Sequence, residues 1–243
     1  MRSAALAVLC GLLPALFLTA CDKDAVGGGA DRSAAARSAT ATGPVSAVDG
    51  RKLAAAVALP AEDWGTGFEK GDPYEDAASD YSVTDASCKE QIGRAPASLV
   101  AQLSRYVSAP SPDRQTVDHL GSSGISVFGA QADAKKDFAD SRADFARCPS
   151  WTNADGTTTD SDDRVVEAPA LQLADEVFAV EGRTRYANDG GGLLPFYQLT
   201  ARKGTNVLTA SLDGAQGSST TELAALVQAA MTTMLVKLDA ETA

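Results

Sequence analysis

The stretch FYQLTARKGTNVLTASL, residues 196–212, decides the fold of this chain. Residues 196–202 and 207–212 alternate apolar and polar side chains, which is the period of a β-strand. The four residues between them, 203–206, contain glycine and asparagine and are typical of a hairpin turn. One face of the hairpin is apolar, with Tyr197, Leu199, Ala201, Leu208, Ala210 and Leu212. The other face carries Gln198, Thr200, Arg202, Thr209, Ser211 and Asp213. A sheet with one apolar side needs helices to cover that side.

Two amphipathic helices are predicted to supply that cover. Residues 130–147 place apolar side chains on one stripe, and Pro149 ends the segment. Residues 223–238 repeat apolar side chains at helical spacing, and Ser219 and Glu222 form a capping box in front of them. Short strands are expected over 165–168 and 176–181. The order of elements predicts an α+β domain, an antiparallel sheet with helices packed on one face.

The N-terminus has the pattern of a lipoprotein signal peptide, predicted to span residues 1–20. Arg2 supplies a positive start, and an apolar run ends in Leu18-Thr19-Ala20-Cys21. The apolar run is too short for a stable transmembrane helix. The pattern predicts cleavage before Cys21 and lipidation of its thiol. An ordinary cleaved signal, with Cys21 present by chance, is the alternative.

A tether is predicted between this signal and the folded part. Residues 22–50 contain no aromatic residue, no leucine and no isoleucine, so they cannot bury enough apolar surface to offset the entropy of ordering. The predicted organisation is a disordered linker over 21–50, carrying the lipidated cysteine, and one domain over 51–243. That domain is expected to begin with a short helix over 52–59, which Pro60 ends.

The charge of the chain excludes one class of partner. The sequence has 21 Lys and Arg against 32 Asp and Glu, a formal net charge of −11. Such a protein is repelled by phosphate backbones and by anionic lipid headgroups, so we expect no nucleic acid partner. Association with the membrane would therefore depend on the lipid anchor.

Two cysteines remain after the signal and the lipidation site are set aside. Cys88 and Cys148 form an even pair in a chain expected to reach an oxidising compartment, which favours a disulfide. Two separate buried thiols are the alternative. A metal site is not expected, because His119 is the single histidine and there is no C-x-x-C motif.

No catalytic constellation can be assembled from the sequence. His119 has no G-x-S-x-G partner, and we expect neither enzymatic activity nor a cofactor. The aspartates over 153–163 lack the spacing of a calcium loop, so that segment is interpreted as a solvated acidic loop.

A ligand cleft is the sharper hypothesis for the aromatic residues. Trp64, Phe68 and Trp151 would line it, and Arg185 or Arg202 would meet an anionic group. The alternative is that the three rings are packing residues near the disulfide. Because the chain is acidic, we expect a neutral, cationic or amphipathic small molecule rather than a strongly anionic one.

Several motifs together resemble a known family. They are Trp64-Gly65-Thr66-Gly67-Phe68, Cys88, Cys148-Pro149-Ser150-Trp151, and residues 196–204 before an amphipathic terminal helix. This arrangement resembles actinobacterial lipoproteins related to the extracellular sensor domain of the mycobacterial kinase PknH, over roughly residues 51–240. The resemblance implies an antiparallel sheet with helices, a central ligand cleft and a disulfide at the two cysteines. The kinase sensor domain has a second disulfide that this sequence lacks.

The function expected from these observations is that of a non-enzymatic, ligand-binding or sensor-like lipoprotein. It would lie on the outer face of the cytoplasmic membrane, held by its lipid anchor. A carrier of lipid, or a chaperone with an envelope protein as partner, is the alternative.

Overall fold

The computed structural model describes residues 45–77, 81–111, 117–187 and 192–243. The predicted signal peptide over 1–20, Cys21 and the tether as far as residue 44 lie outside the described residues. Lipidation at Cys21 therefore stays a prediction.

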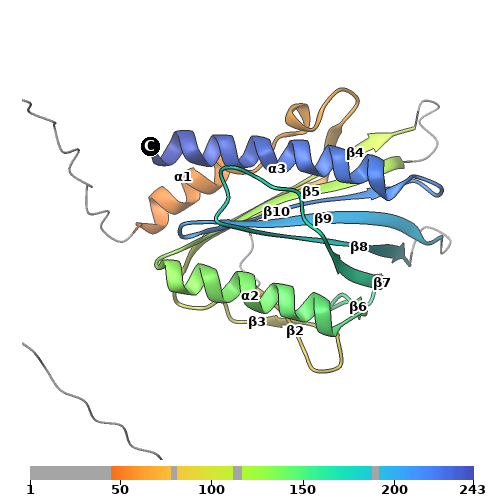
Figure 1. Cartoon of the computed structure of the whole chain (residues 1–243), viewed down its shortest axis with the longest axis horizontal. Helices are drawn as coiled ribbons and strands as arrows, with labels where there is room; N and C mark the ends of the chain where they lie inside the picture. Colours follow the sequence, from red (N-terminus) through yellow and green to blue (C-terminus); the bar gives the residue numbers. More distant parts are fainter. Residues whose placement is uncertain (1–44, 78–80, 112–116, 188–191) are drawn as a thin grey trace, which may run out of the picture. The chain divides into compact units, whose positions relative to one another are not determined.

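The described chain is built on one eight-stranded antiparallel sheet (Figure 1). Its strands, in spatial order, are β1 (Glu69–Asp76), β4 (Leu99–Pro110), β5 (Val117–Phe128), β10 (Asn206–Gly214), β9 (Leu194–Lys203), β8 (Glu176–Tyr186), β7 (Thr158–Val166) and β6 (Ser150–Thr152). A separate two-stranded hairpin consists of β2 (Tyr81–Thr84) and β3 (Glu90–Gly93). The predicted antiparallel α+β class is confirmed.

The predicted hairpin forms β9 and β10 at the centre of the sheet. Lys203 and Asn206 are paired across the strands, so the turn is only Gly204-Thr205 and the strands are longer than expected. Gly204 has φ +59°, a conformation that glycine adopts without steric cost.

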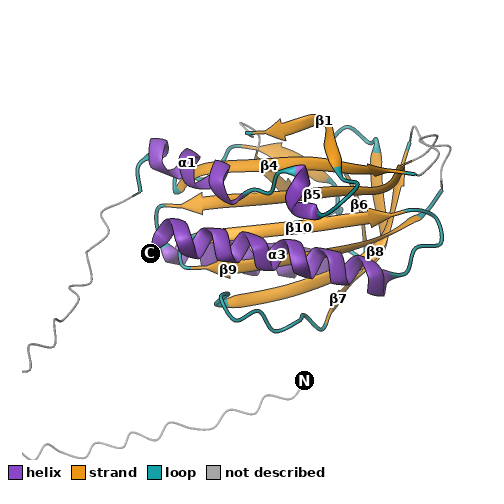
Figure 2. Ribbon diagram, turned by 90° about the horizontal axis from the view of Figure 1, so that it is seen from above, coloured by secondary structure: helices purple, strands orange, loops and turns teal. Residues whose placement is uncertain are grey.

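The larger core lies on the apolar face of this hairpin. Three elements cover that face: α1 (Ala47–Val57), the 3₁₀ turn η1 (Ala61–Trp64) and α3 (Thr220–Thr242). Figure 2 shows α3 lying along the sheet. The capping box of Ser219 and Glu222 is confirmed, and the helix buries Leu223, Val227, Ala230, Met231, Met234, Leu235 and Leu238. By length and composition alone α3 could cross a membrane, but here its apolar stripe is packed in the core.

The first helix begins earlier than expected. Ser46 caps α1 by accepting a hydrogen bond from the Asp49 backbone N–H at 3.1 Å. Gly50 is buried, and a Cβ there would come within 2.9 Å of the Val100 side chain. Close packing of the helix on β4 therefore orders residues that composition alone assigned to the tether.

The other helix, α2 (Gln131–Arg147), packs on the opposite face of the sheet. Its residues Ala134, Phe138 and Phe145 contact a second core made by Phe128, Phe178, Val180, Phe196 and Val207. Helices therefore cover both faces rather than the one face expected. The reason is that aromatic residues such as Phe178 and Phe196 stand on the side of the sheet that alternation marked as polar.

The acidic segment after Trp151 is only in part the solvated loop that was expected, because Asp155 and Asp162 are exposed but two other aspartates are buried. Asp160 and Asp163 lie in β7 with exposed fractions of only 8% and 5%. A bulge between Ser161 and Arg164, with Asp162 at φ +59°, changes the alternation and turns Asp163 inward.

Candidate functional site

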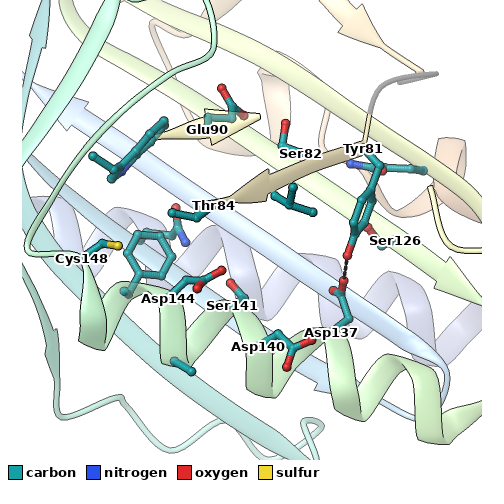
Figure 3. A pocket seen from close by; sticks show the side chains of 16 residues that line it. Tyr81, Ser82, Thr84, Glu90, Ser126, Asp137, Asp140, Ser141, Asp144 and Cys148 are labelled. Atoms are coloured by element: carbon teal, nitrogen blue, oxygen red, sulfur yellow. Dashed lines mark hydrogen bonds between the residues drawn. The ribbon is translucent and has the colours of Figure 1, made fainter. Parts of the chain in front are cut away.

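A hollow of about 590 Å³ lies between α2, the β2–β3 hairpin and the sheet face that α2 covers. We call it the α2 hollow. Figure 3 shows its lining side chains, which come from the helix, from the hairpin and from the strands beneath.

The hairpin is fixed to α2 at several points. The Tyr81 hydroxyl donates to Asp137 Oδ1 at 2.6 Å (Figure 3). Arg147 Nη1 donates to the backbone carbonyl of Asp85 at 2.9 Å. The disulfide between Cys88 and Cys148, predicted from the sequence, joins the hairpin to the residue after α2. These contacts hold the β2–β3 hairpin against α2, so two segments that are far apart in sequence form one wall of the hollow.

The lining of the α2 hollow is divided between apolar and polar groups. Phe145 and the half-buried Trp151 supply aromatic surface. Gln102, Ser126 and Gln198 come from β4, β5 and β9 and form a polar floor. The amide oxygen of Gln102 is buried without a hydrogen-bond partner among the described residues. The indole N–H of Trp151 acts on the carboxylate of Asp160, its cross-strand partner, and favours the ionised form of that group.

Four carboxylates line the hollow, contributed by Glu90, Asp137, Asp140 and Asp144 (Figure 3). Two of them have cationic partners, since Lys136 pairs with Asp140 and Arg147 pairs with Asp144. Glu90 accepts a hydrogen bond from the Ala154 backbone N–H at 2.9 Å and has no ion pair within the described ranges.

The side chain of Asp137 is half-buried. Burial raises the pKa of the Asp137 carboxyl above its usual range, although the hydrogen bond from Tyr81 acts in the opposite direction. Burial and the adjacent Asp137 together raise the pKa of the Tyr81 phenol. The phenol is therefore a fixed donor to Asp137, and a cation placed here would favour the ionised carboxylate.

The structure does not bring the expected cleft residues together. Trp64 is 5% exposed and belongs to the core under α3, on the face opposite to the α2 hollow. Phe68 packs with it, the ring centroids being 5.8 Å apart, and stacks on His119 at 6.2 Å. Trp64 and Phe68 are therefore packing residues, as the alternative expected, but they lie on the face opposite to α2 and not near the disulfide. Trp151 alone among the expected residues lines the α2 hollow.

The expected anion-binding arginines also lie elsewhere. Arg202 is 6% exposed and forms ion pairs with Asp175 at 2.8 Å and Glu176 at 2.6 Å. Because its charge is already neutralised, it is a structural residue. Arg185 is exposed near the end of β8 and does not line the α2 hollow.

Asp137, Asp140 and Asp144 of α2 line the hollow, and the sequence contains no signal that a hairpin about 50 residues earlier would cover this side of the helix. Among the described residues, no group of three or more His, Cys, Asp and Glu side chains is arranged to hold a metal ion.

Comparison with known proteins agrees with this architecture. No family model and no curated protein sequence matches the chain. The extracellular domain of PknH from Mycobacterium tuberculosis is similar in structure, with TM-score 0.51 and 13% identity over 81% of this chain and 98% of that one. An uncharacterized Mycobacterium smegmatis protein, the Rv0999 ortholog, aligns with TM-score 0.36 and 9% identity over 74% of this chain and 98% of its own. The resemblance to the PknH extracellular domain is thereby shown at the level of the fold.

Proposed function

We propose that this domain is a non-enzymatic, extracytoplasmic ligand-binding domain of the sensor type, with its ligand in the α2 hollow. The observation that carries the proposal is the lining of that hollow, where the aromatic surface of Trp151 and Phe145 lies beside two carboxylates, Glu90 and Asp137, that have no cationic partner in the described part of the chain. A concave site with apolar walls and a few convergent polar groups is the usual form of a small-molecule site.

The lining favours a cationic or amphipathic ligand. Glu90 and Asp137 can accept hydrogen bonds from an ammonium or guanidinium group, and such bonds are stronger than neutral ones. The ring of Trp151 can pack on an apolar part of the ligand or on the cation itself.

Location outside the cytoplasm has two supports. The Cys88–Cys148 disulfide is typical of an oxidising compartment, and the fold is that of an extracellular domain. Anchoring on the outer face of the cytoplasmic membrane through lipidated Cys21 is part of the proposal and rests on the sequence pattern at residues 18–21.

A lipid carrier or envelope-assembly chaperone is the second candidate. A carrier of acyl chains needs a large apolar cavity, whereas the α2 hollow has polar residues on its floor and carboxylates on its wall. The ligand-binding reading therefore has the better support.

A series of small ligands that differ in charge tests the proposal. The chain has two tryptophans, so in Trp64→Phe the fluorescence reports on Trp151 alone. Titration with 2-phenylethylamine, 2-phenylethanol and phenylacetate, which share a ring and differ in charge, should perturb that fluorescence in the order cation, neutral, anion. In the matched variant Trp151→Phe the remaining Trp64 signal should not respond. Strongest binding by the anion, or no response of Trp151 to any of the three, would contradict the proposal.

A further inference from the structure

A second hollow, of about 620 Å³, opens beside β1, and we call it the β1 hollow. Its lining includes Tyr106 of β4, Ser122 of β5, Tyr186 of β8, and Ser211 and Asp213 of β10. The Tyr186 hydroxyl is hydrogen-bonded to the Asp213 carboxylate.

The two hollows are neighbours on one face of the sheet. Gln102 of the α2 hollow and Tyr106 of the β1 hollow are four residues apart on β4, so they point to the same face at a spacing of about 13 Å. Gln198 of the α2 hollow is the direct cross-strand partner of Ser211 of the β1 hollow. One elongated ligand could therefore occupy both.

Both hollows are acidic. No Lys, Arg or His lines either of them in the described part of the chain. Six lining carboxylates have no cationic partner there: Asp72, Asp76, Glu90, Asp137, Asp155 and Asp213. Such a surface attracts a polycation and repels an anion.

A buried carboxylate, that of Asp160, lies close to both hollows and is 8% exposed. Side-chain hydrogen bonds from Thr184 and Trp151 favour its ionised form. Asp160 is paired across the strands with Trp151 of the α2 hollow. Its charge also contributes to raising the pKa of Tyr186 and of Asp213 in the β1 hollow. The Asp160 carboxylate therefore adds negative potential close to both hollows.

The polar floor narrows the class of ligand. Ser122, Ser126 and Ser211 are small, and the hydroxyls of Ser122 and Ser211 lie 2.9 Å apart. Hydroxyls both donate and accept, so they can pair with the N–H and C=O groups of an extended peptide. Side chains of such a peptide point to alternate sides, and six residues span about 20 Å, enough to reach from one hollow into the other.

We propose that the α2 and β1 hollows together form one binding groove for an extended, Lys- or Arg-rich peptide segment of a partner. This assignment rests on the proposed function and adds to it the class of ligand and the second hollow. The cationic side chains would meet the six lining carboxylates that have no cationic partner among the described residues, and the peptide backbone would lie along the serine floor.

Calorimetric titration with acetylated, amidated hexalysine tests the groove. We expect binding to the wild-type domain and none of hexaglutamate. Glu90→Gln in the α2 hollow and the double variant Asp72→Asn/Asp76→Asn in the β1 hollow should each weaken hexalysine binding about three- to tenfold. Glu62→Gln/Glu241→Gln removes two exposed charges on the α3 face and should leave the affinity unchanged.

The outcomes separate this inference from the proposed function. If Glu90→Gln weakens binding and Asp72→Asn/Asp76→Asn does not, the α2 hollow binds cations and the extension into the β1 hollow is wrong. Equal weakening by Glu62→Gln/Glu241→Gln would show binding to net charge alone and overturn the groove. Spermine should bind less tightly than tetralysine, which has the same charge. Equal affinity for the two would overturn the peptide assignment.

Discussion

Asp163→Asn should change the way the stability of this domain depends on pH. The Asp163 side chain is 5% exposed, and neither carboxylate oxygen has a hydrogen-bond partner among the described residues. The carboxyl lies over Gly182, so closely that a Cβ there would overlap Asp163 Oδ1 and the ring of Phe196. Burial, and then the charges of Asp160 and Asp162, raise the pKa of Asp163 to about 8.

The direction of the effect follows from proton binding. Between the ordinary carboxyl pKa of about 4 and the native value of about 8, the folded chain holds a proton that the unfolded chain has released. The free energy of unfolding therefore falls as the pH rises through this window. For a single group with these two pKa values the loss between pH 5 and pH 8 is about 3–4 kcal/mol.

Urea unfolding followed by circular dichroism at pH 5, 6, 7 and 8 measures this loss. Asparagine resembles the protonated carboxyl, so Asp163→Asn should match the wild type at pH 5 and be more stable by about 3 kcal/mol at pH 8. The free energy of unfolding of Asp163→Asn should still fall somewhat as the pH rises, because burial raises the pKa of Asp160 to about 6 and that of Asp213 to about 7. Glu241→Gln removes an exposed carboxylate on the α3 face, is the matched control and should keep the wild-type slope. Parallel pH profiles for Asp163→Asn and the wild type would refute the reasoning.

Three further changes have defined outcomes. Cys88→Ala/Cys148→Ala should lower the free energy of unfolding by about 4 kcal/mol in urea titrations, because the bridge closes a loop with a sequence separation of 60 residues; no change in the midpoint would contradict this. Gly182→Ala should cost about 1–3 kcal/mol in the same assay because of the overlap with Asp163 and Phe196, whereas Gly192→Ala, with open space around it, should cost little; equal costs would argue against the overlap. Cys21→Ala should move the protein from the membrane fraction to the soluble or uncleaved pool in cell fractionation, and unchanged membrane association with the signal removed would count against lipidation.

Local periodicity was sufficient to predict the central elements. Residues 196–212 form the β9–β10 hairpin, and the Ser219–Glu222 capping box starts α3 as expected. In both cases the signal is contained in one short segment, because alternation and capping involve residues close together in the chain. The disulfide was predictable from the count of remaining cysteines.

The site could not be predicted in the same way, because it is made by long-range packing. Tyr81 meets Asp137 across 56 residues, and nothing in either segment indicates the other. The burial of Asp163 depends on a bulge at Asp162, which breaks the alternation that sequence reasoning uses. Nothing in the sequence distinguishes the role of Trp64 from that of Trp151. The sheet separates the two residues, so their different roles become visible only in three dimensions.

The sheet also separates the chain ends of the folded domain from its hollows. Residue 45, where the described chain begins, leads into α1, and the C-terminal residue Ala243 follows α3; both helices lie on the face opposite to α2 (Figure 1). Fusions, affinity tags or surface-coupling groups added at Ala243 would therefore be directed away from the α2 and β1 hollows. Immobilisation through that end is the orientation to choose for biosensor measurements on this domain, since it leaves the acidic face accessible to soluble ligands.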